Sequence, residues 1–176
     1  MEILDERGRP LRWGVGRVVL IAVALASFGV WVYAYSGRAD RPTPDLLGDP
    51  GFAAAAEPRC AAARAELDQL EPAYRARDHL DRAATIDQAN LILGAMVADL
   101  RQLPVADDRD RQIVDAWLGD WETFLEDRAG YAQRLRDDPA ARFYQSDVAN
   151  ELLDRRLVRM ATTNAMPSCG DPGDVG

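Results

Sequence analysis

Two cysteines, Cys60 and Cys169, are the first residues of this chain whose type suggests specific chemistry. An isolated pair of cysteines in an oxidising compartment usually forms a disulfide. This bond would close a loop of about 110 residues, for which the loop-entropy relation gives roughly 4–5 kcal/mol of stabilisation. We predict a Cys60–Cys169 disulfide. Two free thiols are the alternative, and a zinc site is disfavoured because the chain has a single histidine, His79, and no CxxC pair.

Two tryptophans, Trp117 and Trp121, stand one helical turn apart beside Phe124. Rings in this arrangement could line a groove, so Trp117 and Trp121 are our candidate partner or ligand surface. The alternative is a place in the core, because burial of an aromatic side chain removes roughly 150–250 Å² from water.

Several carboxylates lie on the same segment and could act as general acids or metal ligands: Asp115, Asp120, Glu122, Glu126 and Asp127. Their positions mostly oppose the tryptophans on a helix, which predicts a solvated face. The sequence lacks the Glu-x-x-His pattern of di-iron bundles, the spaced oxygens of a calcium loop, and hydrolase and phosphate-loop motifs. We predict no catalytic residue, no metal and no cofactor, and thus a protein that is not an enzyme.

Helical periodicity dominates the chain after residue 56, and no segment alternates as a strand would. The first helix is expected from about Glu57, with Pro58 near its start and a break at Pro72. The others are expected at Ala84–Gln102, Arg109–Arg136 and Ala140–Thr163, the last with Tyr144 and Val148 facing inward and Asn164 as its C-cap. The sequence therefore predicts an all-α fold, an antiparallel bundle of about four helices.

The stretch Val18–Tyr35 contains no charged residue, Asn or Gln. Eighteen helical residues span roughly 27 Å, close to the ~30 Å hydrocarbon core of a bilayer. We predict a transmembrane signal anchor over residues 18–36 that contacts the lipid bilayer. Four arginines precede it and two follow it closely, which favours a cytoplasmic tail at 1–17 and an extracytoplasmic C-terminal domain. Cleavage after Ala26 is the alternative, although the apolar run continues well beyond that position.

The remaining boundaries follow from composition. Residues 37–56 are rich in Pro and Gly and predict a linker, residues 57–169 form the bundle, and residues 170–176 are expected to be a mobile tail. From Val18 onward the chain has 17 Arg and 26 acidic residues, a net charge of −9. This balance disfavours binding to nucleic acid or to an anionic lipid surface. All 21 basic residues are arginine, a usage typical of GC-rich bacterial genomes.

The region Trp117–Val175 resembles a group of uncharacterised actinobacterial single-pass membrane proteins. The matching features are WLGDWETFLEDRAGYAQRL at Trp117–Leu135, Phe143, NAMPSC at Asn164–Cys169 and PGDV at Pro172–Val175. The resemblance implies an anchored envelope protein and supplies no activity. Our hypothesis from the sequence is a non-enzymatic interaction module that binds an envelope or membrane protein. The alternative is a ligand- or stress-sensing ectodomain that acts through a membrane partner.

Overall fold

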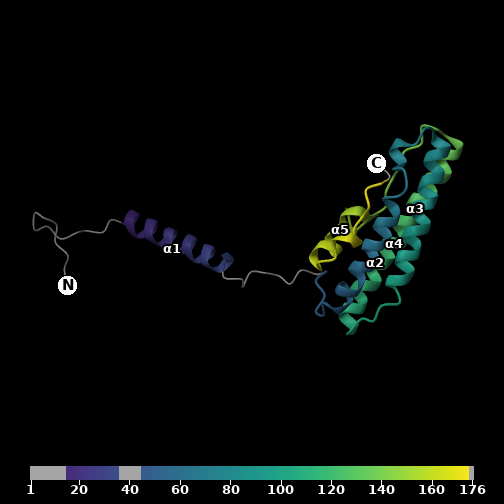
Figure 1. Ribbon diagram of the computed structural model, residues 1–176. Coiled ribbons are helices and arrows are strands. Elements are labelled where there is room, and N and C mark those ends of the chain that lie inside the picture. Colours follow the sequence, from purple (N-terminus) through teal and green to yellow (C-terminus); the bar gives the residue numbers. More distant parts are fainter. Residues whose placement is uncertain (1–14, 36–44, 175–176) are drawn as a thin grey trace, which may run out of the picture. The chain divides into compact units, whose positions relative to one another are not determined.

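The computed structural model describes residues 15–35 and 45–174 and is predominantly helical (Figure 1). The chain divides into two compact units, one ending at Thr43 and one beginning at Pro44. The first contains α1, and the second contains the other elements: α2 (Gly51–Leu67), η1 (Ala73–Arg75), α3 (His79–Leu100), α4 (Asp108–Asp137), β1 (Asp147–Val148), β2 (Glu151–Leu152), α5 (Leu153–Thr163) and η2 (Pro167–Cys169).

Helix α1 (Val15–Tyr35) covers the predicted anchor, and all of its residues from Gly16 to Val32 are exposed. Among the side chains that the structure describes, no helix meets the length and apolarity that a membrane crossing requires. The side chains of the last three residues of α1 lie outside the described part, as do residues 1–14 of the predicted tail and 36–44 of the predicted linker. The anchor therefore stays a prediction.

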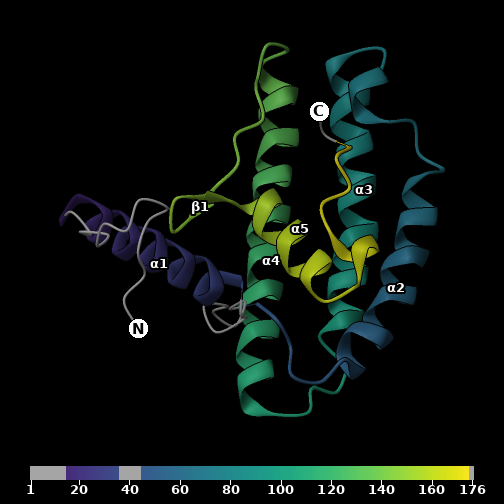
Figure 2. The same ribbon diagram turned by 90° about the vertical axis from the view of Figure 1, so that its left-hand side faces the viewer.

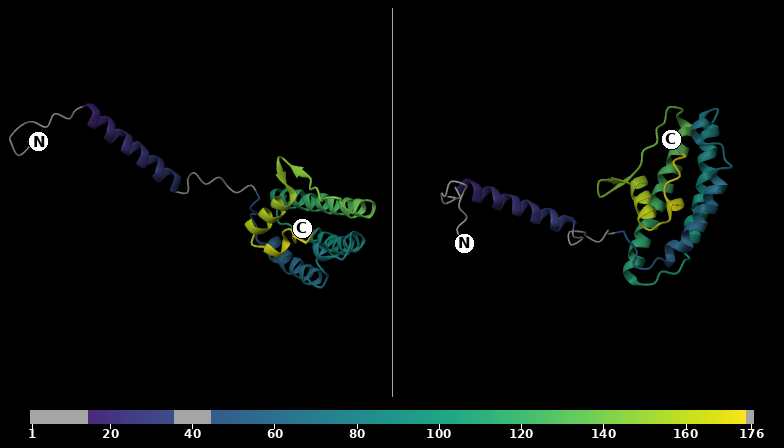
Figure 3. Two further views of the ribbon diagram at one scale, coloured as in Figure 1. Left: turned by 90° about the horizontal axis from the view of Figure 1, so that it is seen from above. Right: turned by 60° about the vertical axis from the view of Figure 1, so that its left-hand side comes forward.

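The second unit is a helical bundle, as the sequence predicts. Helices α2, α3 and α4 follow one another in alternating directions, with α3 packed against both neighbours (Figure 2). The shorter α5 packs on α4, and η2 packs on α2, so the C-terminal part of the chain covers the open side between α4 and α2 (Figure 3, left). The fourth helix thus closes only part of the bundle.

Two of the long helices agree closely with the sequence. Helix α4 differs by one residue at each end, and Asp107 caps it by accepting a hydrogen bond from the N–H of Asp110. Helix α3 begins five residues before the expected Ala84, because Asp78 caps it by accepting from the N–H groups of Leu80 and Asp81. The apolar residues expected to face inward from α3 are all buried: Ile86, Ala89, Leu93, Met96, Val97 and Leu100.

Helix α2 corrects the predicted boundary between linker and bundle. It begins at Gly51, so Pro58 lies inside the helix instead of near its start. Phe52 and Ala53 are buried, and Leu47, ahead of the helix, also belongs to the core. A proline in a helix removes one backbone hydrogen bond, and the burial of these apolar residues offsets that loss. The Pro- and Gly-rich composition of residues 45–56 therefore reflects a packed turn and helix start, and the linker prediction was wrong there.

The predicted helix at Ala140–Thr163 is wrong over its first half, since α5 begins only at Leu153. The preceding residues form a hairpin in which Asp147 pairs with Leu152, with a two-residue turn at Ala149 and Asn150 where φ is 54° and 64°. Such positive φ angles suit a tight hairpin turn. Tyr144 and Val148 are exposed, although the helical pattern had placed them inside. The end of α5 is as expected, because Asn164 is the C-cap.

The C-terminal residues 170–174, which we call the strap, are fixed to the bundle and do not form the mobile tail that composition had suggested. Arg64 of α2 donates to the carbonyls of Ser168 (3.0 Å), Gly170 (2.8 Å) and Asp171 (2.9 Å). At the other end Asp174 forms an ion pair with Arg128 of α4. The strap runs along the open side of the bundle beyond α5 (Figure 2).

Asp171 in the strap lowers the stability of the folded state in a way that depends on pH. Burial raises the pKa of its carboxyl group above the usual value, so the folded state disfavours the charged form. We expect Asp171→Asn to raise the melting temperature at pH 7. Because the penalty is present above the folded pKa, the gain should vanish as pH falls below the ordinary value of 3.8. Melting curves from pH 3 to 8 test this, with Asp115→Asn on the exposed face of α4 as control; a gain independent of pH would contradict it.

Gly119 offers a stabilising substitution in α4. A β-carbon built there meets no atom within 4 Å, and the residue has ordinary helical geometry. Replacing glycine by alanine inside a helix typically gains roughly 0.5–1 kcal/mol. We expect this increase in the free energy of urea unfolding for Gly119→Ala. Gly173→Ala is the opposite control, because φ at Gly173 is +68° and alanine there is strained. A loss of stability in Gly119→Ala would show that the helix uses this glycine.

Candidate functional site

The clearest candidate site is a hollow of about 280 Å³ where α4 and α5 meet the segment that precedes α2. We call it the junction hollow. Its walls include charged groups from all three segments and an apolar part from Trp117 and Met160. Its charged residues include Asp45, Asp120, Arg156 and Arg159.

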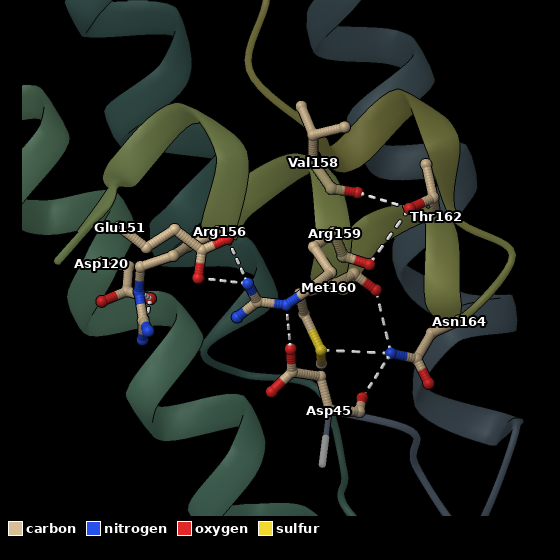
Figure 4. Close-up of polar contacts among 9 residues, drawn as sticks. All are labelled: Asp45, Asp120, Glu151, Arg156, Val158, Arg159, Met160, Thr162 and Asn164. Atoms are coloured by element: carbon tan, nitrogen blue, oxygen red, sulfur yellow. Dashed lines mark hydrogen bonds and ion pairs between the residues drawn. The ribbon is translucent and has the colours of Figure 1, made fainter. Parts of the chain in front are cut away.

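Charges in the junction hollow neutralise one another. Arg156 approaches the Asp120 carboxylate through Nε (2.9 Å) and a terminal nitrogen (2.8 Å). Arg159 bridges Asp45, at 2.6 Å from Nε, and Glu151 (Figure 4). The bond to Glu151, followed by the bond to Asp45, raises the pKa of the Arg159 guanidinium. These ion pairs tie α5 to α4 and to the start of the domain.

The start of the domain, residues 45–49, is held by side chains from α4 and α5; we call it the junction segment. Asp110 is buried and its carboxylate accepts from the N–H groups of Gly48 and Asp49, each at 2.9 Å. Asn164 donates to the carbonyl of Asp45 (2.8 Å) and accepts from the N–H of Leu47 (2.9 Å). The chain is therefore bonded into the bundle within a few residues of the second unit's start.

Asp110 should make the junction segment sensitive to acid. The N–H groups of Gly48 and Asp49 lower the pKa of Asp110, because they bind its charged form. The stabilisation is present above the ordinary value of 3.8 and is lost as pH falls through the lower folded pKa. We expect Asp110→Asn to lower the melting temperature at pH 7, with the gap from wild type closing below pH 3.8. Asp108→Asn, at an exposed neighbouring carboxylate, is the matched control; an equal, pH-independent loss in both variants would contradict this role.

Trp117 and Trp121 are buried, so the prediction of a partner or ligand surface is wrong as regards an exposed face; Trp117 does border the junction hollow. Their exposed fractions are 3% and 0%. Phe52 of α2 meets Trp117 edge-on at 6.4 Å between ring centroids, and Phe124 meets Trp121 at 5.8 Å. Both tryptophans belong to the core, which was the alternative, because α2 begins at Gly51 and so brings Phe52 against Trp117 of α4. Neither indole N–H finds a hydrogen-bond acceptor among the described residues.

The predicted disulfide is confirmed. Cys60 and Cys169 are joined at 2.05 Å with a Cα–Cα distance of 5.0 Å, and both are buried. Glu57 and Arg64, one turn to either side of Cys60 on α2, also bind the C-terminal segment. The spacing of these three residues on one helical face is the sequence signal that could have indicated a packed C-terminus.

The carboxylates of α4 divide into two groups. Asp115, Glu122 and Glu126 are exposed as expected, whereas Asp120 is buried against Arg156 and Asp127 accepts from Ser146. Sequence reasoning also missed two buried charged residues on α4, Asp110 and Arg128. Within the part of the chain that the structure describes, no three His, Cys, Asp or Glu residues are grouped as metal ligands would be.

No family model, curated protein or solved structure matches this chain. The resemblance to actinobacterial membrane proteins therefore stays a prediction from the sequence. The geometry itself describes a charge-compensated hollow with an aromatic wall, in which the ionised side chains bind one another. Such an arrangement suits holding segments together or accommodating a small ligand.

Proposed function

We propose that this chain is a single-pass, membrane-anchored bacterial envelope protein whose extracytoplasmic bundle is a non-enzymatic interaction module. The apolar run Val18–Tyr35 and its arginine flanks support the anchor and its orientation. The buried disulfide supports an oxidising compartment for the bundle, because such bonds persist outside the cytoplasm and are rare inside it. The anchor delivers the bundle to that compartment.

The observation that carries the interaction role is the bonding of the junction segment into the bundle. Asp110 and Asn164 bind the backbone of residues 45–49, and Arg159 binds the side chain of Asp45. These bonds fix the first described residues of the domain to α4 and α5. Arg159 serves this attachment through Asp45, and the Arg156–Asp120 ion pair joins α5 to α4.

Crosslinking at native expression level tests the interaction role. A photoreactive residue at Leu91 or Tyr144, which are 75% and 70% exposed, probes two faces of the bundle. Gln88, exposed on α3 near Leu91, is the matched polar position, and each variant kept in the dark is the control. We expect one discrete adduct from membranes at an exposed position after irradiation and none in the dark. Absence of any adduct across a full scan of the exposed positions would overturn the proposal.

Location is tested separately with a C-terminal tag. We expect the full-length product in the membrane fraction and its tag accessible to protease added outside the cytoplasm. A shortened product in the medium would establish cleavage after Ala26 instead of an anchor. A tag protected inside intact cells would reverse the orientation.

A second candidate, ligand sensing through a membrane partner, is favoured by Trp117. Its indole borders the junction hollow, and its buried N–H has no acceptor among the described residues. A ligand in the hollow would lie beside the Trp117 ring, and a small shift of that ring would let the ligand accept a hydrogen bond from the indole N–H. Full-length protein should then show a saturable shift in tryptophan fluorescence and a higher melting temperature with the ligand, both absent in Trp117→Phe.

A further inference from the structure

Arg128 of α4 is a buried cation with a built set of partners. Its side chain is 0% exposed, between the main core and a smaller apolar cluster that contains Tyr131 and Leu135. Nε donates to the amide oxygen of Asn90 at 2.6 Å, and the guanidinium carbon lies 5.7 Å from the Phe124 ring. The two terminal nitrogens donate in parallel to the Asp174 carboxylate at 2.6 and 2.8 Å.

This geometry is that of a carboxylate-binding site. A guanidinium whose Nε is fixed presents its two terminal N–H groups as a planar fork, which matches the two oxygens of a carboxylate. Asn90 and Phe124, from α3 and α4, fix the fork. The bound carboxylate comes from the strap, a short segment outside the helices. The residues that position Arg128 lie on the helices and are separate from the strap.

Asp174 is less buried than Arg128. The Asp174 side chain is 21% exposed and borders a hollow of about 410 Å³, which we call the strap hollow. Its wall combines charged residues with apolar ones from α2, the turn after it, η1 and α3. Besides Asp174, the charged residues are Arg64, Asp68, Glu71 and Arg75, and the apolar ones include Leu67, Leu70, Ala73 and Ala89. A molecule in the strap hollow can therefore approach the carboxylate position beside these apolar side chains.

The strap is fixed to the bundle ahead of Asp174. Arg64 holds the carbonyls of Gly170 and Asp171, and the disulfide fixes Cys169. Pro172 and Gly173 separate these bonds from Asp174, and Gly173 has a left-handed φ of +68°. A change in the backbone angles of Gly173 would move Asp174 and leave the bonds to Arg64 in place.

We propose that Arg128 and Asn90 form a binding site for a small apolar monocarboxylic acid, and that Asp174 is its built-in competitor. The carboxylate of the ligand takes the two terminal N–H groups of Arg128, and its hydrocarbon part lies in the strap hollow. A ligand can bind Arg128 only in molecules from which Asp174 is displaced. The apparent affinity is therefore the intrinsic affinity multiplied by the fraction of such molecules. Removal of the Asp174 carboxylate should therefore unmask it.

Chemical rescue tests the site in the full-length protein. Asp174→Ala leaves Arg128 buried without its carboxylate and should lower the melting temperature. Hexanoate should restore it saturably, and more effectively than acetate, because only hexanoate reaches the apolar wall. Asp174→Asn is the second variant, since it keeps the shape and part of the hydrogen bonding if the alanine variant does not fold. Hexanoate binding to Asp174→Asn, measured by calorimetry, should be roughly tenfold or more tighter than to wild type.

Two controls decide the outcome. Hexan-1-ol has the same chain without the charge, and the Arg128→Met/Asp174→Asn double variant lacks the fork. Hexan-1-ol should not bind Asp174→Asn saturably, and hexanoate should not bind the double variant saturably. Equal binding of hexanoate by the double variant, equal binding of hexan-1-ol, or no binding of hexanoate to Asp174→Asn would each overturn the proposal. These readouts do not depend on membrane anchoring or on a protein partner, so they stand apart from the interaction role.

Discussion

Serine at both Cys60 and Cys169 is expected to lower the free energy of unfolding by about 4–5 kcal/mol. The bond joins residues separated by 109 positions, so its loss frees a long loop in the unfolded chain. Domains of this size typically have only about 5–15 kcal/mol of stability in total, so the variant should unfold near physiological temperature. Urea denaturation of the full-length protein, followed by circular dichroism, measures the change.

Two comparisons separate the effect of losing the crosslink on stability from the effect of changing the two side chains. The Cys60→Ala/Cys169→Ala variant avoids burying two hydroxyl groups, and wild type in reductant keeps both sulfur atoms. All three should lose stability, with the serine variant losing the most because its buried hydroxyls need partners. Wild-type stability in any of them would mean that the helices alone fix the C-terminal segment.

Loss of the disulfide should loosen the C-terminal segment before it unfolds the whole domain. Cys169 lies between α5 and the strap, and the neighbouring contacts of Glu57 and Arg64 bind the same C-terminal segment. Without the disulfide, these hydrogen bonds hold the strap against α2 unaided. Hydrogen exchange in residues 168–174 should therefore accelerate more than in α3, which packs between two helices.

Long, strongly periodic elements could be predicted from the sequence, and the reason is physical. Helices α3 and α4 bury one stripe each against neighbours on one side, so their apolar residues recur at helical spacing. The disulfide was equally accessible, because two cysteines allow one intramolecular pairing. These features depend on residue type and spacing alone.

Irregular segments could not be predicted, because their conformation depends on distant partners. Residues 45–49 look like linker until Asp110 and Asn164 bind their backbone. The segment before α5 has a helical apolar pattern, yet Asp127 of α4 binds Ser146 and Asn150 adopts a turn conformation. Tertiary hydrogen bonds of this kind leave no periodic trace in the sequence.

The two buried charged residues Asp110 and Arg128 were missed for a related reason. Sequence reasoning assigns charged residues to solvent, which is correct for most of them. Asp110 and Arg128 are exceptions because each has partners from elements far along the chain: the junction segment for Asp110, and α3 and the strap for Arg128. A buried charge needs such partners, and they are visible only once the fold brings them together.

Trp121→Ala should be the most damaging single substitution in the core, with an expected loss of about 3–5 kcal/mol in the free energy of unfolding. Trp121 is fully buried in the main cluster and contacts Phe124 edge-on. Truncation removes its apolar contacts and leaves a cavity that the three long helices cannot collapse around without shifting. Urea denaturation measures the loss, and Leu91→Ala on the exposed face of α3 is the control for a large apolar side chain outside the core.

Trp121→Phe sharpens the test, because it separates ring volume from the indole N–H. That N–H is buried and has no acceptor among the described residues, so phenylalanine breaks no hydrogen bond that the structure shows. Phenylalanine removes this donor and keeps most of the aromatic contact. Its loss should therefore be well below that of Trp121→Ala. If Trp121→Phe instead costs as much as alanine, the indole nitrogen makes a necessary hydrogen bond, to a water or ligand, and the interior near α4 is a binding site and not simply core.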